Sequence, residues 1–99
     1  MRLVAYIEEN ISRELPIENL ADHCNVSRTV FYNKIKGLTG SSPIEFTRKI
    51  KLNRARHILA DGNNVSEAAF MTGFSDVKYF SRLFKNQFGY LPSKHKSEV

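Results

Sequence analysis

The chain has very few of the features on which secreted and membrane-spanning proteins depend. Its 99 residues include one cysteine, Cys24, which cannot form a disulfide within the chain and which we expect to be a small packed residue. No apolar run approaches the roughly 20 residues needed to span a bilayer. The first residues lack the apolar stretch and the cleavage site of a secretory signal. We therefore expect a cytoplasmic location and no membrane contact by this segment.

Catalytic and metal-binding motifs are also missing. The three histidines, His23, His57 and His95, are scattered, and His23-Cys24 lacks the spacing of zinc ligands. The chain contains neither the nucleophile elbow of hydrolases nor a glycine-rich phosphate loop. A domain this small also has little room for a deep catalytic cleft. We expect no enzymatic activity, no cofactor and no metal site.

Acidic residues are outnumbered by basic ones. Fifteen Lys and Arg against ten Asp and Glu give a formal net charge of +5. This balance attracts polyanions, which makes nucleic acid the leading partner. Ordinary solubilising charge would produce the same total, so only the positions of the charges can distinguish a nucleic-acid-binding surface from a merely soluble one.

Helical patterns account for the whole chain, and no strand-like alternation appears, so the sequence predicts an all-α fold. Leu3, Ile7 and Ile11 mark a first helix that Pro16 closes. Ser42-Pro43-Ile44-Glu45 combines an N-cap, a first-turn proline and a capping-box glutamate at the start of a long connecting helix. We expect about seven helices in all.

The second half of the chain repeats the first, as short helix, turn, long helix, glycine and proline. At an offset of 48 residues, Ile17, Leu20 and Ala21 match Val65, Ala68 and Ala69. At an offset of 49, the matched residues are Phe31, Ile35, Lys36, Gly40 and Pro43 with Phe80, Phe84, Lys85, Gly89 and Pro92. We therefore interpret residues 1–99 as one domain. Its parts are a helix with a first helix-turn-helix (1–42), a connecting helix (43–61), and a second helix-turn-helix with a tail (62–99).

In helix-turn-helix motifs generally, the second helix lies in the major groove of DNA and its outward face reaches the bases. In the first unit we expect Val30, Phe31 and Ile35 to face inward. The outward residues are then candidates for base contacts, namely Arg28, Thr29, Tyr32 and Asn33 in the first unit and Val77, Lys78, Ser81 and Arg82 in the second. Arg82 suits guanine and Asn33 suits adenine, while the apolar groups of Val77 and Thr29 suit the methyl group of thymine.

Phosphate contacts are expected from basic residues beside these faces. Lys36 and Lys85 follow the base-contact candidates of each unit. The connecting helix carries five basic residues without an intervening acid, a density that suits phosphate contacts or solvation, at Arg48, Lys49, Lys51, Arg54 and Arg56. Of these we assign phosphate contacts to Arg48 and Lys49. The aromatic cluster Phe70, Phe74, Tyr79, Phe80, Phe84 and Phe88 is expected to be core.

The run from Gly73 to Lys85 (GFSDVKYFSRLFK), followed by Phe88-Gly89 and Pro92, closely resembles the signature of the AraC/XylS family. The resemblance extends from about Ile17 to Pro92. It implies two helix-turn-helix subdomains that enter successive major-groove segments of double-stranded DNA, and contacts to RNA polymerase in activators. By motif position, the resemblance implies base contacts from Thr29, Tyr32, Asn33, Val77, Lys78 and Arg82. The first unit departs from the family pattern at Asn33 and Ile35, which leaves open the bases that it reads.

The run from Phe31 to Lys36 (FYNKIK) also resembles family members fused to the end of hybrid two-component sensors. That resemblance implies that signal sensing and oligomerisation belong to domains outside this chain. Two other functions fit the basic charge, a helical bundle that binds an acidic protein and a nonspecific nucleic-acid binder. The first would not distinguish a selected DNA site from random DNA, and the second would bind any duplex equally or prefer single strands.

Overall fold

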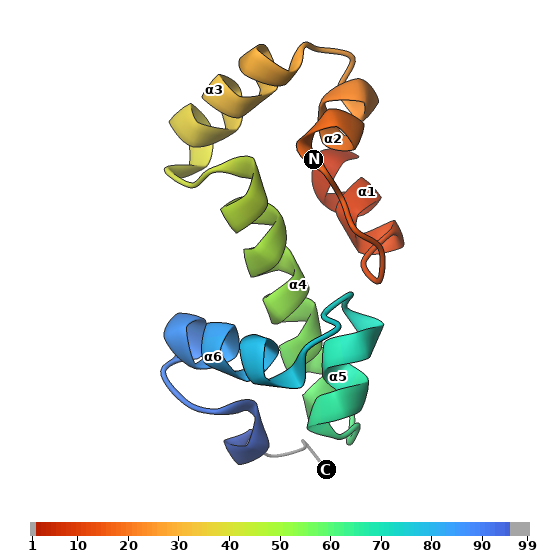
Figure 1. Ribbon diagram of the computed structural model, residues 1–99, viewed down its shortest axis with the longest axis vertical. Coiled ribbons are helices and arrows are strands. Elements are labelled where there is room, and N and C mark those ends of the chain that lie inside the picture. Colours follow the sequence, from red (N-terminus) through yellow and green to blue (C-terminus); the bar gives the residue numbers. More distant parts are fainter. Residues whose placement is uncertain (1, 96–99) are drawn as a thin grey trace.

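The computed structural model describes residues 2–95, which form six α-helices and one 3₁₀ helix (Figure 1). The elements are α1 (Arg2–Glu9), α2 (Ile17–His23), α3 (Arg28–Thr39), α4 (Pro43–Ala60), α5 (Val65–Met71), α6 (Val77–Phe88) and η1 (Pro92–Lys94). No strand occurs among these residues, so the predicted all-α fold is confirmed, with six α-helices where about seven helices were expected. The end of the predicted tail, residues 96–99, lies outside the described residues. None of the described helices has the length and apolarity that a membrane crossing requires.

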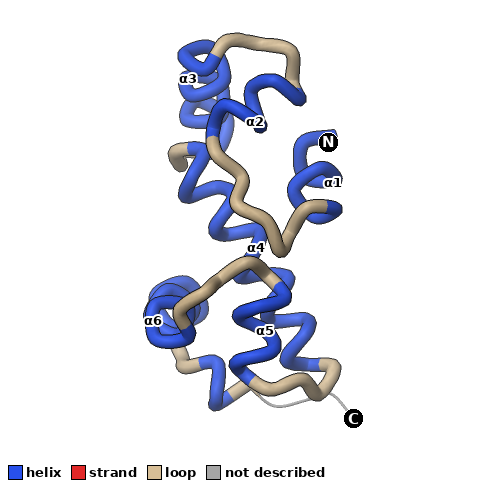
Figure 2. Tube along the Cα trace, turned by 45° about the vertical axis from the view of Figure 1, so that its right-hand side comes forward, coloured by secondary structure: helices blue, strands red, loops and turns tan. Residues whose placement is uncertain are grey.

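The molecule is elongated, with principal extents of 42 × 24 × 23 Å. Helix α4 runs along its middle and joins the two ends (Figure 1). Helices α1, α2 and α3 surround the first half of α4, and α5 and α6 pack on its second half (Figure 2). The arrangement is that of two helix-turn-helix units joined by a long central helix, as the sequence predicts.

Each unit has its own hydrophobic core. The first core consists of Leu3, Ile7, Leu20, Ala21, Phe31 and Ile35, with Phe46 and Ile50 of α4 packed against it. The second core consists of Leu52, Ala55, Ile58, Leu59, Ala68, Ala69, Phe74, Phe80 and Phe84. The first half of α4 therefore belongs to one core and the second half to the other. The relative orientation of the two units is not set by a shared core.

The internal repeat predicted from the sequence is realised in the structure. Ala21 and Ala69 are both buried where the two helices of each unit pack closely. Gly40 and Gly89 end α3 and α6 with φ angles of 75° and 85°, in the left-handed region that glycine occupies without steric cost. The matched prolines that follow, Pro43 and Pro92, are both buried.

Side-chain caps define where the helices begin. Ser27 accepts a hydrogen bond from the backbone N–H of Val30 at the start of α3. Complete capping boxes start α4, with Ser42 and Glu45, and α5, with Asn64 and Glu67. Asp76 caps α6 by accepting from the N–H groups of Lys78 and Tyr79. The start of α4 was predicted from Ser42 and Glu45.

The capping box of α4 makes the stability of the domain depend on pH. The backbone N–H of Ser42 donates to Glu45, and this bond, with the hydrogen bond to the Ser42 side chain, holds the pKa of Glu45 below its usual 4.5. A carboxylate with a lowered pKa stabilises the fold above its unfolded-state pKa, and this stabilisation is lost as the pH falls through the folded-state pKa. We expect Glu45→Gln to lower the free energy of unfolding at pH 7 and the deficit to shrink below pH 4.5. Urea unfolding at pH 7, 5 and 3.5 measures this, and a deficit that is constant with pH would contradict it.

Three predictions about burial are wrong. Val30 is 50% exposed because it lies about 100° around α3 from Phe31, which already faces the core. Phe70 is 55% exposed because α5 buries the preceding residues Ala68 and Ala69. Cys24 is exposed because it follows the last turn of α2, beyond the surface that packs on α3. In each case the residue type favours burial, but the position of the residue, on the outer side of a helix or just beyond its end, does not.

Candidate nucleic-acid interface

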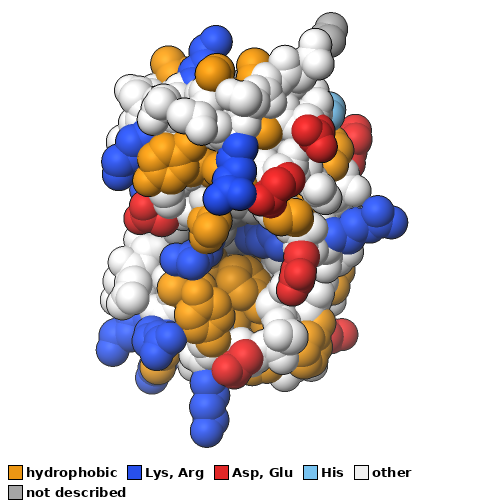
Figure 3. All heavy atoms as spheres, turned by 45° about the horizontal axis from the view of Figure 1, so that its top comes forward, with side chains coloured by type: hydrophobic (Ala, Val, Ile, Leu, Met, Phe, Trp, Pro, Cys, Tyr) orange, Lys and Arg blue, Asp and Glu red, His pale blue; other side chains and the backbone are white. Residues whose placement is uncertain are grey.

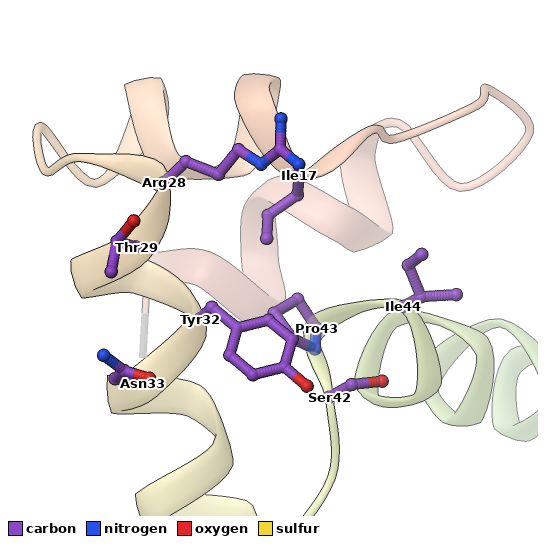
Figure 4. Close-up of a pocket in the computed structure, with 8 residues that line it drawn as sticks. All are labelled: Ile17, Arg28, Thr29, Tyr32, Asn33, Ser42, Pro43 and Ile44. Carbon is purple, nitrogen blue, oxygen red and sulfur yellow. The ribbon is translucent and has the colours of Figure 1, made fainter.

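The four base-contact candidates of the first unit lie together on exposed positions of α3. They line a hollow of about 390 Å³ whose other wall is formed by Ile17 and by Ser42, Pro43 and Ile44 at the start of α4. In Figure 4 the Tyr32 ring lies against the Pro43 side of the hollow, and Thr29 and Asn33 project from the outer face of α3. Hydrogen-bonding groups, an aromatic ring and a guanidinium are therefore available on one face.

Arg28 is held in place by an ion pair in the free protein. Its Nη1 atom lies 2.9 Å from Oε1 of Glu18 on α2. The two side chains are 68% and 56% exposed. Exposed pairs contribute only about 0–1 kcal/mol, so an approaching DNA phosphate or base edge can replace Glu18 at small cost.

The base-contact candidates of the second unit lie on α6 and differ in their solvent exposure. Lys78 and Arg82 are exposed, whereas Val77 and Ser81 are half-buried. Val77 packs against the second core, so only part of its side chain is accessible. The structure therefore places two basic side chains outermost and a smaller, partly apolar surface between them.

Tyr79 joins a base-contact candidate to a phosphate-contact candidate. Its ring lies under two guanidinium groups, with the Cζ of Arg82 on α6 at 5.3 Å from the ring centroid and the Cζ of Arg48 on α4 at 6.0 Å. Such cation–π contacts contribute about 0.5–1 kcal/mol each at exposed sites. Tyr79 thereby restricts the orientations of Arg82 and Arg48, a role that was not predicted because an aromatic ring at this position is expected in the core.

The three lysines assigned to phosphate contacts occupy two settings. Lys36 and Lys85 are exposed in the last turns of α3 and α6, at matched positions of the repeat. Lys49 is exposed on α4, and its Nζ donates to the Oγ of Ser41 at 2.8 Å. These side chains carry positive charge beside each of the two candidate faces and at the helix that joins them.

The basic residues of α4 include both solvent-accessible and buried side chains, a difference that the composition of the run does not reveal. Lys51 is only 9% exposed, so it is not available to DNA as Arg48 and Lys49 are. Its position could have been found from the spacing of the helix, since Thr47, Lys51 and Ala55 recur every four residues on the buried side of α4. Burial lowers the pKa of Lys51, and the carboxylate of Glu14 opposes this shift.

The two candidate faces lie on the same side of the molecule. Helices α3 and α6 both appear on the left of α4 in Figures 1 and 2. On the face drawn in Figure 3, basic side chains gather along the left-hand part and around a central hollow, while most acidic ones lie to the right. The 42 Å length of the molecule exceeds the 34–36 Å or so that separates successive major-groove segments on one side of DNA. One chain is long enough to reach both segments.

A family model described as a helix-turn-helix domain matches residues 20–98 of the chain. Together with the two units described above and with the solved relatives below, this match shows that the chain belongs to the AraC-type family of DNA-binding domains. It is thus a DNA-binding domain of the kind found in transcription regulators.

The chain is similar to parts of longer bacterial proteins. It is 34% identical over 93 residues to Histidine kinase P4 of Formosa agariphila, with 92% of the chain and 7% of that protein aligned. It is 30% identical over 92 residues to the HTH-type transcriptional activator RhaS of Citrobacter koseri, with 92% of the chain and 33% of that protein aligned. The chain therefore spans about a third or less of the length of these relatives.

Solved structures agree with the fold over nearly the whole chain. An AraC-type transcriptional regulator from Chromobacterium violaceum is 28% identical, with a TM-score of 0.89 over 94% of this chain and 84% of that one. The DNA-binding domain of AdpA, solved in complex with a target DNA, is 26% identical, with a TM-score of 0.80 over 93% of this chain and 84% of that one.

Proposed function

We propose that this domain recognises a specific double-stranded DNA site by placing α3 and α6 in two successive major-groove segments. The observation that carries the proposal is the placement of two exposed, acid-free helix faces on one side of a molecule 42 Å long. Base contacts come from Arg28, Thr29, Tyr32 and Asn33 on α3 and from Val77, Lys78, Ser81 and Arg82 on α6. Lys36, Arg48, Lys49 and Lys85 bind phosphates.

The larger protein that we propose is a bacterial transcription activator acting in the cytoplasm. The transcriptional activator RhaS and Histidine kinase P4 are both similar to this chain over 92% of its length. In such a protein this domain is the non-catalytic output module of a hybrid two-component regulator, and sensing and oligomerisation belong to its other domains. Contact with RNA polymerase would couple DNA binding to transcription.

Selection from a randomised duplex library tests the proposal. We expect enrichment of a motif that spans two adjacent major-groove segments. Across a salt series, the selected duplex should bind about a thousandfold more tightly than a scrambled one, as specific sites commonly do. Uniform, salt-sensitive binding without a motif would leave only electrostatic attachment, and binding to neither duplex would favour a bundle that recognises an acidic protein.

A further inference from the structure

Three segments that are distant in the sequence meet around the buried amine of Lys51. The Nζ atom of Lys51 donates to the backbone carbonyl of Arg13 at 2.7 Å, across 38 residues of sequence. Arg13 lies in the segment between α1 and α2, so this bond ties the middle of α4 to the first unit.

The turn between α5 and α6 in the second unit also contacts the amine of Lys51. Gly73, between α5 and α6, has a φ of +86°, and a Cβ atom placed there would lie 2.8 Å from the Nζ of Lys51. It would also lie 3.0 Å from the carbonyl oxygen of Ile11. The turn of the second unit thus lies directly against the segment of the first unit that Lys51 holds.

Two hydrogen bonds tie the units to the middle of α4, the one from Lys51 to the carbonyl of Arg13 in the first unit and a longer one from the Nε2 of Gln87 in α6 to the carbonyl of Lys49, at 3.4 Å. Within residues 2–95, no hydrogen bond runs directly from α1, α2 or α3 to α5 or α6. The two hydrophobic cores are separate, and the residues on either side of Lys51 belong to different ones, Ile50 to the first and Leu52 to the second. The relative orientation of the units therefore depends on α4, on the contacts of α6 with Arg48 and Lys49, and on the contacts around Lys51, which alone bring the turn of the second unit against residues 11–13 of the first.

We propose that Lys51 is a positioning residue that fixes the orientation of α3 relative to α6 and so sets the spacing of the two DNA segments that the domain accepts. The inference rests on the proposed function, because a spacing preference requires that both helices read DNA. Lys51 does not touch DNA in this arrangement. It acts through the backbone of residues 11–13 and the turn at Gly73.

Replacing Lys51 by methionine keeps the length of the side chain and removes its hydrogen bond to Arg13. Arg54→Met is the matched control, since Arg54 is an exposed cation on the same helix and its loss changes the net charge equally. Affinities are measured for the selected duplex and for duplexes with one base pair inserted or deleted between the two segments. We expect the wild type and Arg54→Met to prefer the selected spacing by about tenfold or more, equivalent to about 1.4 kcal/mol, and Lys51→Met to lose most of that preference.

A second measurement needs no DNA. Spin labels on α3 and α6, at Lys34→Cys and Asn86→Cys in a Cys24→Ser background, report the distribution of distances between the two helices. We expect a narrow distribution in the wild type and in Arg54→Met and a broader one in Lys51→Met. If no protein enriches a DNA motif, the proposed function fails, and the distance distributions still decide the role of Lys51.

Circular dichroism first establishes that each variant is folded, and Lys51→Gln serves as a second variant. A folded variant that keeps both the narrow distribution and the spacing preference would overturn the proposal. Failure of both variants to fold would overturn it as well, because Lys51 would then be required for folding rather than for positioning.

Discussion

Phe84→Ala will remove about 3–5 kcal/mol from the free energy of unfolding, the cost expected for truncating a buried phenylalanine. The Phe84 side chain is fully buried at the centre of an aromatic cluster. Its ring centroid lies 4.6 Å from that of Phe88, 5.6 Å from Tyr90 and 5.9 Å from Phe80. Domains of this kind are stable by only about 5–15 kcal/mol, so the variant will lose a large part of its stability.

Urea unfolding followed by circular dichroism measures this effect. Phe70→Ala is the matched control, because Phe70 has the same side chain on the neighbouring helix and is 55% exposed. We expect the control to change stability by about 0.5 kcal/mol or less. A loss of less than about 1 kcal/mol in Phe84→Ala would show that the aromatic cluster is not the main support of the second unit.

Arg82→Ala will have the largest effect on recognition. The Arg82 guanidinium is exposed on α6 and rests over the Tyr79 ring. In the proposed complex its planar fork would contact the O6 and N7 atoms of a guanine. Loss of one such contact costs about 1–3 kcal/mol, or roughly 5- to 150-fold in affinity for the selected site. Binding to scrambled DNA should fall much less, since only one charge is removed.

The measurement compares the selected duplex with duplexes that carry single base changes in the segment read by α6. Arg82→Ala should accept every base at one position and keep its preferences elsewhere. Arg82→Lys is the control that retains the charge and removes the planar fork, and it should also relax that position. An Arg82→Ala protein with unchanged base preferences would remove Arg82 from direct readout.

Much of the fold follows from local signals in the sequence. Ser27, Ser42 and Asn64 start helices through hydrogen bonds to residues three positions ahead, so their role does not depend on distant parts of the chain. Gly40 and Gly89 end helices for an equally local reason, the left-handed φ that the chain adopts there. The repeat of such signals was sufficient to predict two matched units.

Other features depend on tertiary contacts that a composition or a motif does not encode. Lys51 looks like one more cation in a basic run, yet the carbonyl of Arg13, 38 residues away, gives its amine a buried partner. Tyr79 was predicted to be a core aromatic, but its half-buried ring also supports Arg48 and Arg82 from different helices. The candidate base contacts were selected by residue type and helical position, and their contacts with DNA stay a prediction.

Recognition of one major-groove segment by each of α3 and α6 is tested most directly by measuring binding to duplexes in which one half of the selected site is scrambled. Reading by both α3 and α6 predicts that scrambling either half weakens binding by about tenfold or more and that scrambling both reduces it to the nonspecific level. It also predicts that Arg82→Ala loses discrimination only in the half read by α6. Equal affinity for the intact, half-scrambled and fully scrambled duplexes would contradict sequence-specific recognition by this domain.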